Sequence, residues 1–288
     1  MNNHISRHWR AYTLSILLVV LAIVIIPYIS AGVSVRNVVQ RTFSPVIPTN
    51  DMVVVKVTGI IAQEWAIDLD QALSRENTKG VILWIESPGG STTEAKLLSH
   101  YINALRYKYH KPIHIFSEYL LASGAYWVAT YADSIFAAPT ASVGSIGVYA
   151  VRGDRTAADS IAGIKLFFFS MGEYKLWGAP NLPPSERELQ SIADGVFWAY
   201  IEFVTTVTYN RYDQFKAITD KACGCNADTT TVVTYVRSLA EGNLYGAPNA
   251  FTAGLIDGVL YFDQLCTKLR EQGFTVRRPD GTVIDLLY

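Results

Sequence analysis

The sequence predicts an α/β fold with a largely parallel sheet. Short apolar runs typical of strands buried on both faces recur in the first half of the chain, at 52–57, 81–85 and 112–117. Helical segments separate them: 67–73, and a stretch whose apolar face holds Leu97, Leu98, Tyr101, Ile102 and Leu105. Strands that alternate with helices at this spacing favour parallel pairing through right-handed crossovers. Half of the 288 residues are hydrophobic, sufficient for one sizeable core.

The second half of the chain is less regular. The expected elements are a short strand at 134–138, a strand at 164–169, a long helix at 185–209 and a C-terminal hairpin at 275–287 around Asp280-Gly281. The glycine-rich stretch 254–258 is expected to close a helix. The segment 215–235 has no pattern that assigns it.

The N-terminus carries a separate signal. From Ala11 to Val33 no side chain is charged, and about 20 apolar residues suffice to span a bilayer. The small residues at 30–32 would also suit signal-peptide cleavage, but the apolar run exceeds the usual core of about 7 to 15 residues, which favours an uncleaved anchor. Arginines on both sides leave a slight positive-inside bias, and the simplest topology keeps the short tail in the cytoplasm and the bulk of the protein outside.

These features predict the domain organisation. A short tail covers 1–10, a transmembrane anchor 11–33, a linker with two prolines 34–50, and one folded domain 51–288.

Composition excludes several classes of function. The net charge of −1 gives no electrostatic basis for nucleic-acid binding. The three cysteines, Cys223, Cys225 and Cys266, are too few for a disulfide framework or a four-ligand zinc site. A Cys223–Cys225 bridge would be strained, either residue could pair with Cys266, and at least one thiol stays free. No metal, nucleotide or organic cofactor is indicated.

A candidate nucleophile, Ser123, lies in the stretch Leu121-Ala122-Ser123-Gly124-Ala125-Tyr126-Trp127, between an apolar strand and an apolar helix. At a helix N-terminus, free backbone N–H groups would stabilise an oxyanion beside the serine. The alternative is an ordinary N-cap serine, which needs no chemistry.

A nucleophilic serine needs a base to accept its proton. The five histidines are His4, His8, His100, His110 and His114, and none follows Ser123. A lysine can serve where burial keeps it neutral. Lys175, between Tyr174 and Leu176-Trp177, is the candidate, although a single lysine in a loop more often extends into solvent.

Five motifs occur in the order and approximate spacing of one known family: Ser87-Pro88-Gly89-Gly90, Ala122-Ser123-Gly124-Ala125-Tyr126, Gly144-Ser145-Ile146-Gly147-Val148, Gly172-Glu173-Tyr174-Lys175 and Gly254-Leu255-Ile256-Asp257. Over residues 52 to 262 the chain resembles the signal peptide peptidase A family. That resemblance implies a membrane-anchored Ser-Lys peptidase on the ClpP/crotonase-like fold, with repeated ββα-type units, so that 51–288 is a peptidase domain.

The resemblance also implies roles for individual residues. Ser123 matches the family's nucleophile, and Lys175, 52 residues downstream, matches its general base. The backbone N–H groups of Gly90 and Gly124 match the oxyanion hole, and Ser145 matches the serine that orients the lysine.

In this family the lysine often comes from a neighbouring subunit, so the resemblance implies a homo-oligomer. It also implies peptide substrates, such as cleaved signal peptides. Glu86 stands where the family usually has Asn, and Ala125 where a second glycine is common. The segment 215–235 replaces a shorter family stretch.

Two other functions remain open on the same fold. One is a non-catalytic scaffold that organises membrane partners; the presence of both Ser123 and Lys175 disfavours it. The other is an acyl-CoA enzyme of the crotonase type, which fold alone does not exclude. An extracytoplasmic location, away from CoA, disfavours it.

Overall fold

The computed structural model describes residues 50–284, all within one compact unit, Thr49–Tyr288. The strands are β1 (Asp51–Thr58), β2 (Thr78–Glu86), β3 (Ile113–Ser117), β4 (Leu120–Ala122), β5 (Ser134–Ala137), β6 (Ser142–Gly144), β7 (Leu244–Gly246), β8 (Gly258–Val259) and β9 (Thr275–Arg277). The main sheet has the order β8-β5-β3-β2-β1-β9, and all its neighbours are parallel. In a second sheet, β4-β6-β7, only β7 runs antiparallel. The expected α/β fold with a mostly parallel sheet is confirmed.

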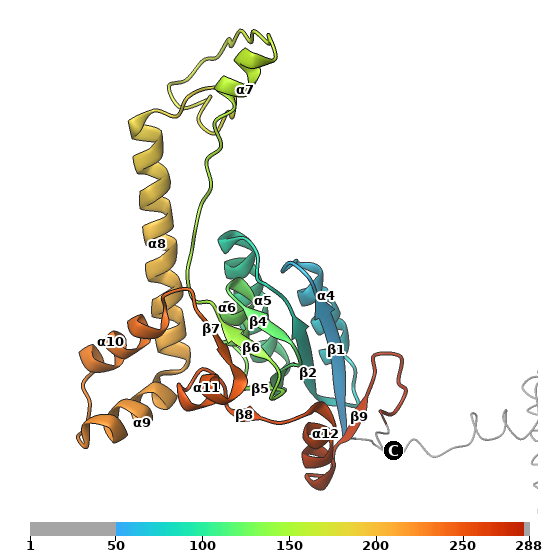
Figure 1. Ribbon diagram of the computed structural model, residues 1–288. Helices are drawn as coiled ribbons and strands as arrows, with labels where there is room; N and C mark the ends of the chain where they lie inside the picture. The colour runs from blue at the N-terminus through green and yellow to red at the C-terminus, as the bar shows by residue number, and fades with distance from the viewer. Residues whose placement is uncertain (1–49, 285–288) are drawn as a thin grey trace, which may run out of the picture. The chain divides into compact units, whose positions relative to one another are not determined.

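The helices are α4 (Glu64–Leu73), α5 (Thr92–Tyr109), α6 (Gly124–Ala129), α7 (Thr156–Ile161), α8 (Glu186–Asn210), α9 (Tyr212–Cys223), α10 (Thr229–Leu239), α11 (Ala247–Thr252) and α12 (Phe262–Glu271). Figure 1 shows α7 and its loops at one end of the long helix α8, and α9 at the other. The segment 152–183, which contains α7, is called the arm below.

The main sheet is buried on both faces because side chains alternate along each strand. In β1, Val53, Val55 and Val57 join the core that contains α4, α5 and α6. Met52 and Val54 point the other way, into a smaller core with Leu265, Cys266 and Leu269 of α12. Apolar runs without polar alternation are therefore what these strands require, and the strands expected at 52–57, 81–85 and 112–117 are confirmed.

Several expectations for the second half hold, and two need correction. The long helix is α8, where the Ser185 hydroxyl caps the N-terminus by accepting from Glu188 N at 3.2 Å. The unassigned segment 215–235 belongs to α9 and α10.

The strand expected at 164–169 is wrong. These residues have no regular structure and are exposed, because no strand among residues 50–284 lies beside them to accept their backbone hydrogen bonds. The C-terminal hairpin is only partly formed: β9 pairs in parallel with β1, and a single antiparallel bridge joins Arg277 to Val283.

The transmembrane helix expected over residues 11–33 lies outside the described residues. Between residues 50 and 284, no helix combines the length and the apolar character needed to cross a membrane.

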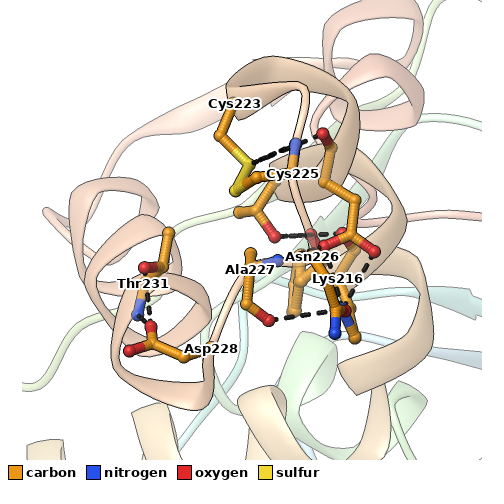
Figure 2. Close-up of a disulfide and its surroundings, with 10 residues drawn as sticks. Lys216, Cys223, Cys225, Asn226, Ala227, Asp228 and Thr231 are labelled. Carbon is orange, nitrogen blue, oxygen red and sulfur yellow. Dashed lines mark hydrogen bonds and ion pairs between the residues drawn. A yellow bond between two sulfur atoms is a disulfide. The ribbon is translucent and has the colours of Figure 1, made fainter.

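The turn between α9 and α10 contains a disulfide between Cys223 and Cys225 (Figure 2). The pairing with Cys266 considered from the sequence is wrong, because Cys266 is buried in α12 and free. The turn is also held without the disulfide: Lys216 Nζ lies 2.9 Å from the Asp220 carboxylate, which accepts from Ala227 N at 2.7 Å.

The disulfide is expected to contribute little to stability, because it closes a loop of only two or three residues. We predict that the double variant Cys223→Ser/Cys225→Ser loses about 1–2 kcal/mol of unfolding free energy. Urea unfolding with and without a reductant measures this, and reduced wild type should match the variant. A loss above about 4 kcal/mol would contradict the prediction.

His114 on β3 is expected to make the fold acid-sensitive. Its Nδ1 is buried without a hydrogen-bond partner, and burial lowers the pKa of His114, although the Asp133 and Asp257 carboxylates partly oppose this. The folded protein therefore keeps His114 neutral at pH values where the unfolded chain, with a histidine pKa of about 6.5, takes up a proton. Stability then falls as the pH drops below about 6.5.

The test compares urea unfolding at pH 8 and pH 5. We predict that His114→Gln loses less unfolding free energy than wild type between these two pH values, because the group that titrates differently is gone. The exposed His100 gives the matched control, His100→Gln, which should keep the wild-type loss. Equal losses in wild type and His114→Gln would refute the assignment.

Candidate active site

Ser123 occupies a strained turn between β4 and α6. Its φ and ψ are 52° and −128°, a region that residues other than glycine rarely adopt. The turn is fixed on both sides: Ser123 N donates to Gly144 O at 2.8 Å, and Ser123 O accepts from Trp127 N at 3.0 Å. The serine side chain makes no capping hydrogen bond. Its hydroxyl is therefore not used as the ordinary N-cap alternative requires.

The loop after β2 approaches this turn so closely that only glycine fits. Gly89 has φ +101°, and a Cβ placed on it would lie 2.8 Å from both Gly124 N and Ser123 Cβ. A Cβ on Gly124 would in turn lie 3.4 Å from Gly90 N. The backbone nitrogens of Gly90 and Gly124 are thus neighbours at Ser123, the arrangement that two donors to one oxyanion need.

These residues open into a cavity of about 900 Å³, lined by Ser123, Gly90 and Gly124. Its remaining wall is mainly apolar, with Ile60, Ala95, Trp127, Val148, Val151, Ile192, Val196, Ala199 and Phe203. The rings of Trp127 and Phe203 stack with centroids 4.6 Å apart. The volume lies within the usual range for ligand pockets, about 300 to 1,000 Å³.

The part of this wall that α8 contributes was missed by sequence reasoning. Residues 192, 196, 199 and 203 recur at helical spacing, which marks an apolar face but not what the face covers. Both this apolar face and the apolar helix after Ser123 are visible in the sequence, but the packing of one against the other is not.

Ser145 lies beside the serine turn but not among the residues that line the cavity. It follows Gly144, whose carbonyl accepts from Ser123 N, and it has a positive φ of 51°. Its own N–H donates to Asn243 O at 2.7 Å.

Lys175 is not brought to Ser123 within one chain. The residues around it are bound to the first turn of α8: Glu173 pairs with Arg187, and Gly178 N donates to Glu188 Oε1 at 2.8 Å. The α8 residue that stacks beside the serine helix, Phe203, comes 15 residues after Glu188. At a rise of 1.5 Å per residue this corresponds to roughly 20 Å along α8. The Lys175 side chain is exposed, so the apolar burial expected from the sequence is absent in the single chain.

The arm is firmly attached at this position. Arg152 Nε lies 2.6 Å from Glu188 Oε1, and both side chains are largely buried. The Arg152 guanidinium, together with Gly178 N–H, holds the pKa of Glu188 below its ordinary value. Arg152 also donates to Ala179 O and Leu182 O, at 2.9 and 3.2 Å. The distance of Lys175 from Ser123 is therefore built into the fold.

The arm exposes large apolar side chains. Ile161, Phe167, Phe169 and Met171 are 81 to 95% exposed. Large apolar side chains that are exposed together on one segment are typical of a contact surface.

Metal ligands do not gather at this site. Within residues 50–284, no group of three or more His, Cys, Asp and Glu side chains could hold a metal ion.

The sequence is similar to known peptidases. The sequence profile described as peptidase family S49 matches residues 106–232, a range that includes Ser123, Ser145 and Lys175.

Three relatives align over most of the chain. A protein of Methanocaldococcus jannaschii named as a protease is 29% identical over 212 residues, 74% of this chain. A protein of Enterococcus faecium named as a signal peptide peptidase SppA is 28% identical over 223 residues, 77% of this chain. Protease 4 of Haemophilus influenzae is 27% identical over 217 residues, 75% of this chain.

The aligned part spans 61%, 58% and 32% of these relatives' own lengths. The matched profile and the similarity to proteases over about three quarters of the chain agree with the motifs read from the sequence. The profile match and these protease relatives support the resemblance to the signal peptide peptidase A family.

Proposed function

We propose that the protein is a membrane-anchored serine endopeptidase that hydrolyses peptides with Ser123 as nucleophile and Lys175 as general base. The observation that carries the proposal is the Ser123 turn. The serine hydroxyl is free of any capping role. The turn meets the loop 87–90, called the glycine loop below, at a cavity with apolar walls.

In the proposed reaction Ser123 Oγ attacks the carbonyl carbon of the scissile peptide bond while Lys175 Nζ accepts the hydroxyl proton. The oxyanion of the tetrahedral intermediate accepts hydrogen bonds from the N–H groups of Gly90 and Gly124. Lys175 then donates its proton to the leaving amine, and an acyl-enzyme remains on Ser123. A water molecule, deprotonated by Lys175, releases the second product.

The proposed site is completed by a second copy of the chain. A general base must lie about 2.6 to 3.2 Å from the proton donor. The segment that carries Lys175 is bound to Glu188, roughly 20 Å along α8 from Phe203, which stacks on the serine helix. If the arm packed against a neighbouring chain, Lys175 would reach that chain's Ser123. The Ser145 hydroxyl of the neighbouring chain would then orient the lysine. The same packing would also cover the exposed Phe167 and Phe169.

We propose peptide substrates near a membrane, including cleaved signal peptides. The apolar cavity walls, with the Trp127–Phe203 stack, favour apolar side chains. The uncharged run over 11–33 would anchor the chain in the cell membrane, with the catalytic domain outside the cytoplasm.

A mixing experiment tests the two-chain site. Ser123→Ala and Lys175→Ala should each lower peptide hydrolysis more than about 10³-fold. Co-expressed in equal amounts, the two variants should recover about a quarter of wild-type activity, because a random head-to-tail assembly joins an intact serine to an intact lysine at about a quarter of its sites.

The control is each variant expressed alone. The oligomeric state is measured on every sample. Assembled mixtures without recovered activity would indicate that both groups act within one chain. Wild-type activity in either single variant would remove the dyad from the mechanism.

The close approach of the glycine loop gives a second test. Gly89→Ala should lower kcat/KM by about 10²-fold, because its Cβ would press on Gly124 N and displace an oxyanion donor. Gly153→Ala is the matched control, since a Cβ there meets nothing within 4 Å. Full activity of Gly89→Ala would argue against an oxyanion hole at this loop.

A further inference from the structure

The Glu86 carboxylate lies at the centre of a dense set of hydrogen bonds. Its Oε1 accepts from Glu118 N at 2.6 Å and from Trp84 Nε1 at 2.7 Å. Its Oε2 accepts from Tyr119 N at 3.0 Å and Leu120 N at 2.9 Å. One side chain thus binds three consecutive backbone N–H groups, at the turn between β3 and β4.

An ionised carboxylate suits this position, because it accepts on both oxygens and donates on neither. A neutral amide of the same shape would turn an NH₂ group toward N–H donors. The turn is open to solvent, with Tyr119 63% exposed. Without the hydrogen bonds to Glu86, its backbone amide hydrogens would exchange readily with water.

Glu86 also stands at the junction of both halves of the site. It is the last residue of β2, immediately before Ser87-Pro88-Gly89-Gly90. The turn that it binds leads, through the three residues of β4, directly to Ser123. Its carboxylate therefore links the start of the oxyanion loop to the start of the nucleophile strand.

We propose that Glu86 is a positioning residue that fixes the turn at 118–120 and thereby holds Ser123 in register with the N–H groups of Gly90 and Gly124. The proposal rests on the proposed function of this site. The proposal also gives a role to the residue that differs from the family pattern. Glu86 stands where the resembled family usually has Asn, and in this chain its carboxylate organises the loop.

The test is Glu86→Gln in the full-length protein. We expect kcat for peptide hydrolysis to fall about 10²-fold, with KM unchanged within about twofold, because the apolar walls that bind substrate stay in place. Glu76→Gln is the matched control: it removes an exposed carboxylate ahead of the other end of β2 and should keep wild-type kcat. An unchanged kcat in Glu86→Gln, or a raised KM with normal kcat, would overturn the proposal.

A second measurement does not depend on activity. Hydrogen exchange should show protection of the Glu118, Tyr119 and Leu120 amides in wild type, and its selective loss in Glu86→Gln. Rapid exchange of these amides in wild type would refute the hydrogen-bonded turn even where the variant fails to fold. If wild type hydrolyses no peptide, the proposed function fails, while protection of these amides would still support the structural role of Glu86.

Discussion

The candidate site depends on the backbone pairing between Ser87 and β4. Ser87 N donates to Leu120 O at 2.8 Å, and Ala122 N donates to Ser87 O at 3.1 Å. These two bonds join the end of β2 to the strand that leads into Ser123, so the glycine loop and the serine turn meet at the carboxyl end of β2. A third bond, from Ser123 N to Gly144 O, fixes the turn from β6. These backbone hydrogen bonds preorganise the geometry around the serine, together with the Glu86 carboxylate at the start of β4.

The same fold that brings these groups together separates the proposed base from them. The long helix α8 lines the cavity with its middle and carries the arm at its N-terminus. The Arg152–Glu188 pair holds the arm there. A rigid spacer between nucleophile and base is unsuited to an intrachain dyad and well suited to a head-to-tail assembly, where each arm serves the next chain. The exposed apolar side chains of the arm fit the same proposal.

Sequence reasoning predicted the sheet and the serine turn, because both are local patterns. The strand at 52–57 is a valine-rich run interrupted only by the exposed Lys56, and the small residues around Ser123 mark a tight turn into a helix. The run at 164–169 is also apolar apart from one lysine, yet no strand within residues 50–284 pairs with it. A single sequence does not show whether a neighbouring strand is present. Glu86 could not be interpreted either, because its hydrogen-bond partners lie 32 to 34 residues away.

The most direct test of the central claim is a cross-link between the proposed nucleophile and base positions. In a Ser123→Cys/Lys175→Cys variant, the native thiols interfere little, since Cys223 and Cys225 are paired and Cys266 is buried. A short bis-maleimide linker should join position 123 of one chain to position 175 of another, and denaturing gels should show a ladder of linked chains that neither single variant gives. A linker found by mass spectrometry to join both positions within one chain would contradict the two-chain site.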